Sequence, residues 1–379
     1  MKGRRTALLA ASLGVVLLAL AAALPPRRAN ASSVNPSVVS TAAILGGLHR
    51  LVVRHGRYRG AVRLVPNGEL SFYFANTGLS RLVDLAPGVV HNYLNRYLTL
   101  TDPVSGRIDD VAATGQPVAS DSDDACAATF LTLVARYEHV SGNTGWVRRH
   151  LALLKRIAYT DLATAQKSAP VPGLIRACQQ GNGPRGAGYL MDNCEDYRGL
   201  VDLVAMLQEN KDPDAAYYRQ VAWGVASGVW GLFDVNRQTW RVSDLPEDAR
   251  AAHDAWYPDG MAQLFPELQG VPGPTLARQQ DGYNAALRVA SRLFRSRTRE
   301  PEDLYSALVY AHYLAHCAHT TRARSLIRQL RPALRRGLRK GFAIGELGYL
   351  AAVKRDLQGL RSCGSIPPAP RSTRTRAQR

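Results

Sequence analysis

The sequence lacks the short motifs that mark several common enzyme classes. It contains no Gly-x-Ser-x-Gly element, no phosphate-binding P-loop and no dinucleotide-binding glycine fingerprint, so the corresponding hydrolases and nucleotide-dependent enzymes are not indicated. None of its five cysteines forms a Cys-x-x-Cys pair, which argues against a thiolate zinc site. Alternating apolar and polar residues are also scarce, and only residues 61–68 suggest a short exposed strand.

Long apolar runs are absent except near the start of the chain. Three basic residues among the first five precede residues 7–24, which are all apolar or small, and Ala29-Asn30-Ala31 then offers a small-x-small cleavage site. We predict that residues 1–31 are a signal peptide, with an uncleaved anchor as the alternative. We therefore expect a periplasmic or extracellular protein, in contact with a membrane only through this segment if it is not cleaved.

Acidic residues are missing from both ends of the chain, which accounts for half of the net charge of +18. Residues 1–31 carry five positive charges and residues 365–379 carry four. The second segment contains three prolines and no apolar periodicity, so we predict a disordered basic tail. Much of the remaining charge lies between Arg322 and Lys340. This distribution does not indicate nucleic-acid binding. We expect the basic helix to be a solvated outer face; the alternative is that it binds an acidic polymer or an anionic lipid surface.

Helical periodicity dominates residues 32–364. In residues 123–140, for example, apolar side chains recur every three or four positions and mark one buried stripe. The same criterion predicts twelve helices, at about 34–54, 69–84, 87–100, 123–140, 144–167, 189–208, 213–233, 257–268, 274–294, 302–317, 319–338 and 341–358.

The connections between these helices differ in length in a regular way. The links 84–87, 140–144, 208–213 and 317–319 are short, which forces antiparallel neighbours. The links 100–123, 167–189 and 233–257 are long and rich in Gly, Pro, Asp and Ser, and such loops are usually functional. Long loops at every second junction emerge on one face. This pattern predicts an all-α, double-ring (α/α)6 toroid over residues 32–364, with a cleft at the N-terminal ends of the even-numbered helices.

Cysteines and histidines offer two weaker sites. Cys178 with Cys194 and Cys317 with Cys363 are candidate disulfide pairs, and the odd count leaves one thiol unpaired. His312 and His316 are four residues apart on one helical face and could share a metal. They lack the glutamate of a metalloprotease motif, so we expect an ordinary buried pair, no bound metal and no cofactor.

Acids gather where the long loops enter the even-numbered helices. Residues 121–124 read Asp-Ser-Asp-Asp, residues 189–197 contain Asp192, Glu195 and Asp196, and residues 256–260 read Trp-Tyr-Pro-Asp-Gly. A single acid at a helix start is usually a cap. Glu195 lies a full turn inside its helix, however, and therefore needs another explanation. Clustered carboxyls suit glycoside hydrolysis, which needs one protonated and one ionised carboxyl group.

Two of these segments resemble a known family. Residues 121–130 read Asp-Ser-Asp-Asp-Ala-Cys-Ala-Ala-Thr-Phe, and residues 189–200 read Tyr-Leu-Met-Asp-Asn-Cys-Glu-Asp-Tyr-Arg-Gly-Leu. Together with Tyr-Pro-Asp-Gly-Met-Ala-Gln at 257–263, they resemble exported bacterial proteins of the six-hairpin glycosidase superfamily. The resemblance spans about residues 70–270 and implies an (α/α)6 barrel that processes carbohydrate. The sequence departs from the family at Cys126, where an aromatic residue is usual.

These observations lead to a specific expectation about function. We predict an inverting, monomeric glycoside hydrolase that acts on a carbohydrate polymer or oligosaccharide of the cell envelope or exterior. Glu195 is the expected general acid and Asp124 the base, with Asp121 completing the catalytic set. A polysaccharide lyase on the same fold and a non-catalytic glycan-binding or export protein are the alternatives. The expected substrate-binding residues are Asp192, Asn193, Asp259, Tyr257, Trp256, Tyr73, Asn76 and Asp110.

Overall fold

The computed structural model describes residues 39–120, 122–177, 186–248, 254–297, 304–317 and 319–359. All of them belong to one of two units of the chain, Ser37–Arg379. The predicted signal segment, the tail, Asp121, Cys178 and Cys363 lie outside the described residues. Within the described part, no helix is both long and apolar enough to cross a membrane.

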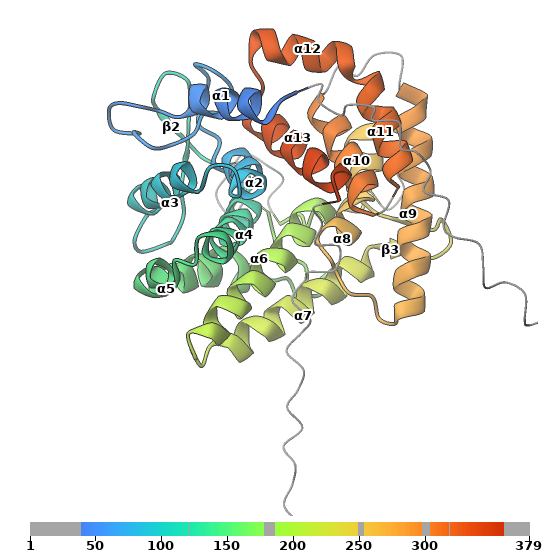
Figure 1. The fold of residues 1–379 in the computed structure, drawn as a ribbon. Coiled ribbons are helices and arrows are strands. Elements are labelled where there is room, and N and C mark those ends of the chain that lie inside the picture. Colours follow the sequence, from blue (N-terminus) through green and yellow to red (C-terminus); the bar gives the residue numbers. More distant parts are fainter. Residues whose placement is uncertain are drawn as a thin grey trace, which may run out of the picture. The chain divides into compact units, whose positions relative to one another are not determined.

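Helices make up most of the described residues, and they form two layers (Figure 1). The inner helices are α2 (Phe72–Leu82), α4 (Asp123–Ser141), α6 (Leu190–Glu209), α8 (Phe265–Leu268), α10 (Leu304–His316) and α13 (Ile344–Leu357). The outer helices are α1 (Thr41–Leu51), α3 (Pro87–Leu100), α5 (Thr144–Ala158), α7 (Ala215–Gly231), α9 (Leu276–Arg297), α11 (Thr320–Gln329) and α12 (Arg331–Lys340). Two π-helical turns, η1 (Tyr159–Ala163) and η2 (Trp256–Gly260), complete the set.

The inner helices follow one another around a ring. α2 contacts α4, α4 contacts α6, α6 contacts α8, and α10 contacts α13, which returns to α2. The short connections after α4, α6 and α10 lead to outer helices that contact the helix before them. The fold is therefore the predicted (α/α)6 toroid, and the N-terminal ends of the inner helices point to one face.

Helix burial follows position in the two layers. On α4, which has neighbours on several sides, most residues from Asp124 to Glu138 are buried, as expected of an enclosed helix. On the outer helix α12 only Ala333 and Leu334 are buried. Gly199 of α6 permits a close approach to α4, since a Cβ there would lie 2.6 Å from the backbone oxygen of Ala128.

The sequence and the structure differ in three places. The predicted helix 257–268 is η2 followed by α8, and Tyr257 inside η2 has an extended backbone (φ −114°, ψ 130°). The predicted helix 319–338 breaks at Leu330, and Pro332 occupies the first turn of α12, where its missing N–H is tolerated. The segment 61–68 forms only an isolated bridge between Val52 and Val62.

Two short antiparallel ribbons occur in the long loops. β1 (Asp110–Val111) pairs with β2 (Pro117–Val118), and β3 (Phe233–Asp234) pairs with β4 (Thr239–Trp240). The first ribbon adjoins the start of α2 through a bridge between Leu70 and Val111. The ribbons therefore help to fix the loops at the face where the inner helices begin.

Candidate active site

The first turns of α4 and α6 bring four carboxyl groups together. Asp124 is the second residue of α4, and Asp192, Glu195 and Asp196 lie in the first two turns of α6. On a helix, residues three and four apart share a face, which explains why the three acids of α6 can point to the same region. The contact at Gly199 holds α4 beside α6, so the acids converge as a consequence of helix packing.

Ser122 connects two of these carboxyls. Its hydroxyl donates to Oδ1 of Asp124 at 2.8 Å and also lies 3.0 Å from Oδ2 of Asp192. One hydroxyl carries one proton and can donate fully to only one acceptor. The contact between the Ser122 hydroxyl and Asp192 is favourable when one of the two carboxyl groups is protonated and supplies a second proton. The geometry thus favours at least one protonated acid in this group.

Asp196 lies against Asp124 and is a residue that the sequence analysis did not assign to the site. Both side chains are completely buried. Burial raises the pKa of Asp196 well above its ordinary value of 3.8, and the charge of Asp124 adds to the shift. We infer that Asp196 is neutral. Asp196 follows Asp192 by four residues on the same helix, and this spacing could have predicted that it belongs to the site.

Glu195 has the environment of a proton donor. It is 3% exposed, and its Oε1 accepts a hydrogen bond from the hydroxyl of Tyr73 at 3.4 Å. Among the described residues, its Oε2 has no hydrogen-bond partner. Burial raises the pKa of Glu195 to about 8, against the opposing effects of Arg81 and Tyr73. At neutral pH this carboxyl therefore keeps its proton.

Asp124 differs from Glu195 in its degree of ionisation. Burial raises the pKa of Asp124 to about 6, while the hydrogen bond from Ser122 lowers it. At pH 7 most of the Asp124 population is ionised and most of the Glu195 population is not. Two nearby carboxyls with separated pKa values provide one acid and one base.

Aromatic side chains and one arginine lie beneath Glu195. Tyr73 packs edge-on against Phe74, which continues to Tyr305 and Tyr349 of α10 and α13. Arg81 of α2 donates to the hydroxyl of Tyr349 at 2.9 Å. This layer keeps water from Glu195 on one side and explains why burial dominates its pKa.

Three of the predicted substrate-binding residues make internal hydrogen bonds. Oδ1 of Asp110 accepts from the backbone N–H of Phe72, the first residue of α2, at 2.9 Å. Asn76 donates to the backbone oxygen of Cys126 at 3.1 Å and so links α2 to α4. Asp259 accepts from the backbone N–H of Ala255 at 3.0 Å. These contacts place the three side chains in the framework around the carboxyls.

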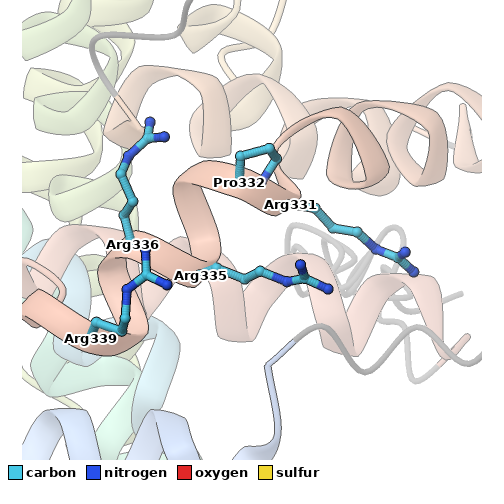
Figure 2. Close-up of a pocket in the computed structure, with 5 residues that line it drawn as sticks. All are labelled: Arg331, Pro332, Arg335, Arg336 and Arg339. Carbon is cyan, nitrogen blue, oxygen red and sulfur yellow. The ribbon is translucent and has the colours of Figure 1, made fainter.

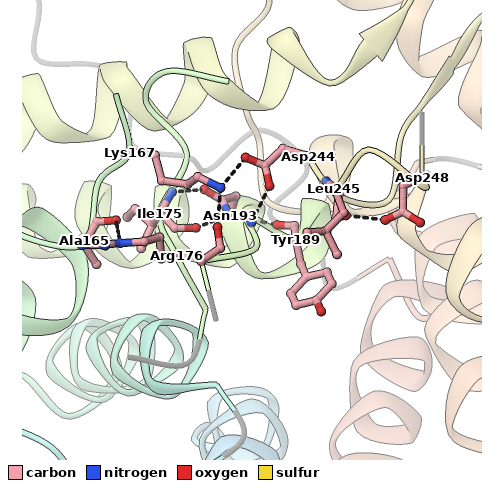
Figure 3. A network of polar contacts seen from close by, with 12 residues as sticks. Ala165, Lys167, Ile175, Arg176, Tyr189, Asn193, Asp244, Leu245 and Asp248 are labelled. Carbon is pink, nitrogen blue, oxygen red and sulfur yellow. Dashed lines mark hydrogen bonds and ion pairs between the residues drawn. The ribbon is translucent and has the colours of Figure 1, made fainter. Parts of the chain in front are cut away.

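Asn193 performs a similar task for the loop before α6 (Figure 3). Its Oδ1 accepts from the N–H of Ile175 at 2.6 Å, and its Nδ2 donates to the Ile175 oxygen at 3.1 Å. Close by, Lys167 forms a buried ion pair with Asp244 at 2.5 Å. Asp244 also accepts from the N–H of Gly188 at 2.9 Å. This network joins the two long loops at the start of α6.

The predicted aromatic platforms differ in exposure. Trp256 is buried, and its ring lies 4.9 Å from the ring of Phe294 and 5.4 Å from that of Tyr310. Tyr257, in contrast, is 56% exposed. The carboxyls of Asp124, Glu195 and Asp196 are buried, whereas Asp192 is half-buried. The backbone oxygen of Val242 accepts from the N–H of Leu190, the first residue of α6, at 2.8 Å.

The histidine pair and the cysteines were the two weaker candidate sites. His312 lies 3.1 Å from Asp356, and burial lowers the pKa of His312 to about 4. The described residues include no group of three or more metal-ligating side chains arranged to hold a metal ion. Cys126 and Cys194 are buried thiols on α4 and α6. Cys178, the candidate partner of Cys194, lies outside the described residues.

Comparison with known proteins extends the result for the fold. No family model matches the sequence, and no curated protein sequence matches it. Among solved structures, the chain is similar to a rhamnosidase from Klebsiella oxytoca with rhamnose bound, with a TM-score of 0.59 and 12% identity. The match covers 84% of this chain and 63% of the rhamnosidase, so the chain spans less than two thirds of that enzyme.

Two further solved structures match this chain over nearly their whole lengths. A glucoamylase from Saccharomycopsis fibuligera matches with a TM-score of 0.57 and 11% identity, over 86% of this chain and 95% of the enzyme. A cellobiose 2-epimerase from Spirochaeta thermophila matches with a TM-score of 0.53 and 11% identity, over 84% of this chain and 94% of the enzyme. At such low identity the likeness establishes the architecture, an all-α toroid of six helical hairpins.

Proposed function

We propose that the protein is a glycoside hydrolase that uses Glu195 as general acid and Asp124 as general base. The observation that carries this proposal is the pair of neighbouring carboxyls whose burial raises their pKa values to about 8 and about 6. The fold is similar to that of a rhamnosidase and of a glucoamylase. Both names denote enzymes that act on carbohydrates, and this similarity supports a carbohydrate substrate. Fold alone does not determine reaction.

The proposed reaction divides between the two carboxyls. Glu195 gives its proton to the glycosidic oxygen as the bond from that oxygen to the anomeric carbon breaks. Asp124 removes a proton from a water molecule, whose oxygen forms the new bond to the anomeric carbon. After one turnover Glu195 is ionised and Asp124 is protonated, and exchange with solvent restores both. We propose inversion at the anomeric carbon, because water attacks directly.

Neighbouring polar groups would support these roles. Asp196, held neutral by burial, adds no negative charge beside Asp124. Tyr73 keeps Glu195 in place through its hydroxyl. Because Glu195 and Asp124 are buried, the proposal requires that groups around the starts of α4 and α6 move when a sugar enters. We propose an exported location and a polysaccharide of the cell envelope or exterior as the substrate.

A panel of neutral and acidic polysaccharides tests the proposal. New reducing ends without unsaturated products would indicate hydrolysis, and proton NMR of the first product would show inversion or retention. Replacing Glu195 by Gln or Asp124 by Asn should lower the rate about 10²- to 10⁴-fold. Glu209→Gln, an exposed position on the same helix, is the matched control. Unsaturated products would instead indicate a lyase, and binding without cleavage a glycan-binding protein.

A further inference from the structure

The outer helix α12 presents a set of charges that the proposed reaction does not use. Arg331, Arg335, Arg336 and Arg339 are all exposed, and we refer to them as the α12 arginines. With Pro332 they line a surface hollow of about 480 Å³. Figure 2 shows that Arg331 and Arg335 extend toward the same side of the helix. The hollow is therefore bordered by guanidinium groups.

The α12 arginines form no ion pair with the described residues. The arginines of the preceding helix differ, because Arg322 donates to Ser291 and Tyr310, and Arg324 donates to the backbone oxygen of Leu357. Like charges repel at short range, so an anion at the hollow would relieve a repulsion that the fold leaves uncompensated.

The chemistry of the hollow narrows the class of anion. Guanidinium groups bind carboxylate, sulfate and phosphate through paired hydrogen bonds. Arg331, Arg335 and Arg339 are four residues apart, so they repeat about every 6 Å along the helix. A row of cations with a regular repeat fits a linear polymer with regularly spaced anionic groups.

Two other polyanions fit less well. Single-stranded nucleic acid is usually bound with aromatic side chains on which bases stack, and the described residues that line the hollow are four arginines and Pro332. A membrane-bound helix inserts a broad apolar face, whereas Leu338 is the only large apolar side chain exposed on α12. A concave surface also suits a chain better than a planar bilayer.

The α12 arginines lie close in sequence to the inner ring of helices. α12 ends at Lys340, and α13 begins at Ile344, so the C-terminal end of the arginine row is close in sequence to the start of an inner helix. The inner helices begin at the face where the carboxyls of α4 and α6 lie. A polymer bound along α12 would therefore reach the same face as the candidate active site.

We propose that the α12 arginines bind an acidic polysaccharide. The choice of a polysaccharide rests on the proposed function, but the binding step needs no cleavage. It can therefore fail or succeed independently of hydrolysis.

Polygalacturonate, a carboxylate polymer, is a suitable probe, with neutral dextran as its uncharged counterpart. Binding to the full chain should be measured at increasing salt, for example by biolayer interferometry with the polymer immobilised. We expect salt-sensitive binding to polygalacturonate and none to dextran. Replacing the four α12 arginines by Gln should weaken binding by at least about tenfold, equivalent to about 1.4 kcal/mol. The Glu195→Gln protein should bind like the wild type, whether or not hydrolysis is ever found.

A second quadruple variant controls for net charge. Arg50, Arg148, Arg149 and Arg219 are exposed on α1, α5 and α7, and replacing them by Gln changes the charge of the protein equally. This variant should keep most of the affinity. Equal weakening in both variants would overturn the proposal, as would absence of binding. Tighter binding of single-stranded DNA or of anionic vesicles through the same four arginines would also overturn it.

Discussion

The start of α4 and α6 and the surface of α12 each gather charges of one sign, but they relieve the repulsion differently. The carboxyls of Asp124, Glu195 and Asp196 are buried, and burial raises the pKa of each. A carboxyl can become neutral by binding a proton, whereas a guanidinium stays charged at any pH a protein experiences. The α12 arginines are accordingly exposed to solvent. Location thus makes one cluster a set of proton carriers and the other a permanent positive surface.

The largest effect on stability should come from breaking a buried ion pair. Asp244→Ala would leave Lys167 charged in a buried position, because the two side chains are 1% and 9% exposed. We expect a loss of about 3–5 kcal/mol in the free energy of unfolding. The control is Asp84→Ala, since the ion pair of Asp84 with Arg355 is partly exposed and should contribute less than about 1 kcal/mol. Urea denaturation measures both, and equal losses would contradict the contrast between buried and exposed charge.

Glu195→Gln should change how stability depends on pH. The folded protein holds the Glu195 proton up to about pH 8, whereas the ordinary pKa is 4.5. Unfolding therefore releases a proton between these values, and wild-type stability falls as pH rises through this range. The Gln variant should be more stable than the wild type at pH 8 by an amount on the order of a few kcal/mol, and this advantage should vanish below pH 4.5. The same advantage at both pH values would show that Glu195 is not the cause.

A smaller effect is expected when the hydroxyl of Ser122 is removed. Ser122→Ala should cost about 1 kcal/mol in stability, because the hydroxyl donates to Asp124 and approaches Asp192. This hydrogen bond lowers the pKa of Asp124, so its loss should raise that pKa. In a pH profile of kcat/KM the acid limb should move to higher pH, and the alkaline limb, assigned to Glu195, should stay. Movement of the alkaline limb alone would reverse the assignment.

The smallest effect on stability should follow from the α12 substitutions. Replacing the four α12 arginines by Gln removes exposed groups that form no ion pair with described residues, so each change should alter the free energy of unfolding by less than about 0.5 kcal/mol. Thermal unfolding of this variant and of the wild type provides the comparison. A large loss would mean that the α12 arginines stabilise the fold, and their role in binding would then need a different test.

Much of the fold could be predicted because its helices are long and strongly periodic. The segment 123–140 is helix α4, at Asp123–Ser141, and 87–100 is α3, at Pro87–Leu100. The separation of α11 from α12 was missed, although Pro332 was visible in the sequence. A proline in a first turn stabilises a new helix as readily as it ends an old one, and the local pattern does not distinguish these cases.

The candidate site was predicted less completely, because hydrogen-bond partners depend on tertiary structure. The grouping of Asp124 with the acids of α6 followed from helix starts alone. The engagement of Asn193 with the backbone of Ile175 could not be predicted, since it depends on how the loop folds back. Burial of Glu195 likewise depends on the side chains of α2, α10 and α13, which are distant in sequence.

The central claim is that Glu195 and Asp124 differ in protonation at neutral pH, and NMR titration of ¹³C-labelled carboxyl groups tests it most directly. Spectra of Glu195→Gln and Asp124→Asn proteins would assign the two signals. We predict that Glu195 titrates near pH 8 and Asp124 near pH 6. If both instead titrate near their ordinary values of 4.5 and 3.8, the two groups are both ionised at neutral pH and cannot act as an acid and a base.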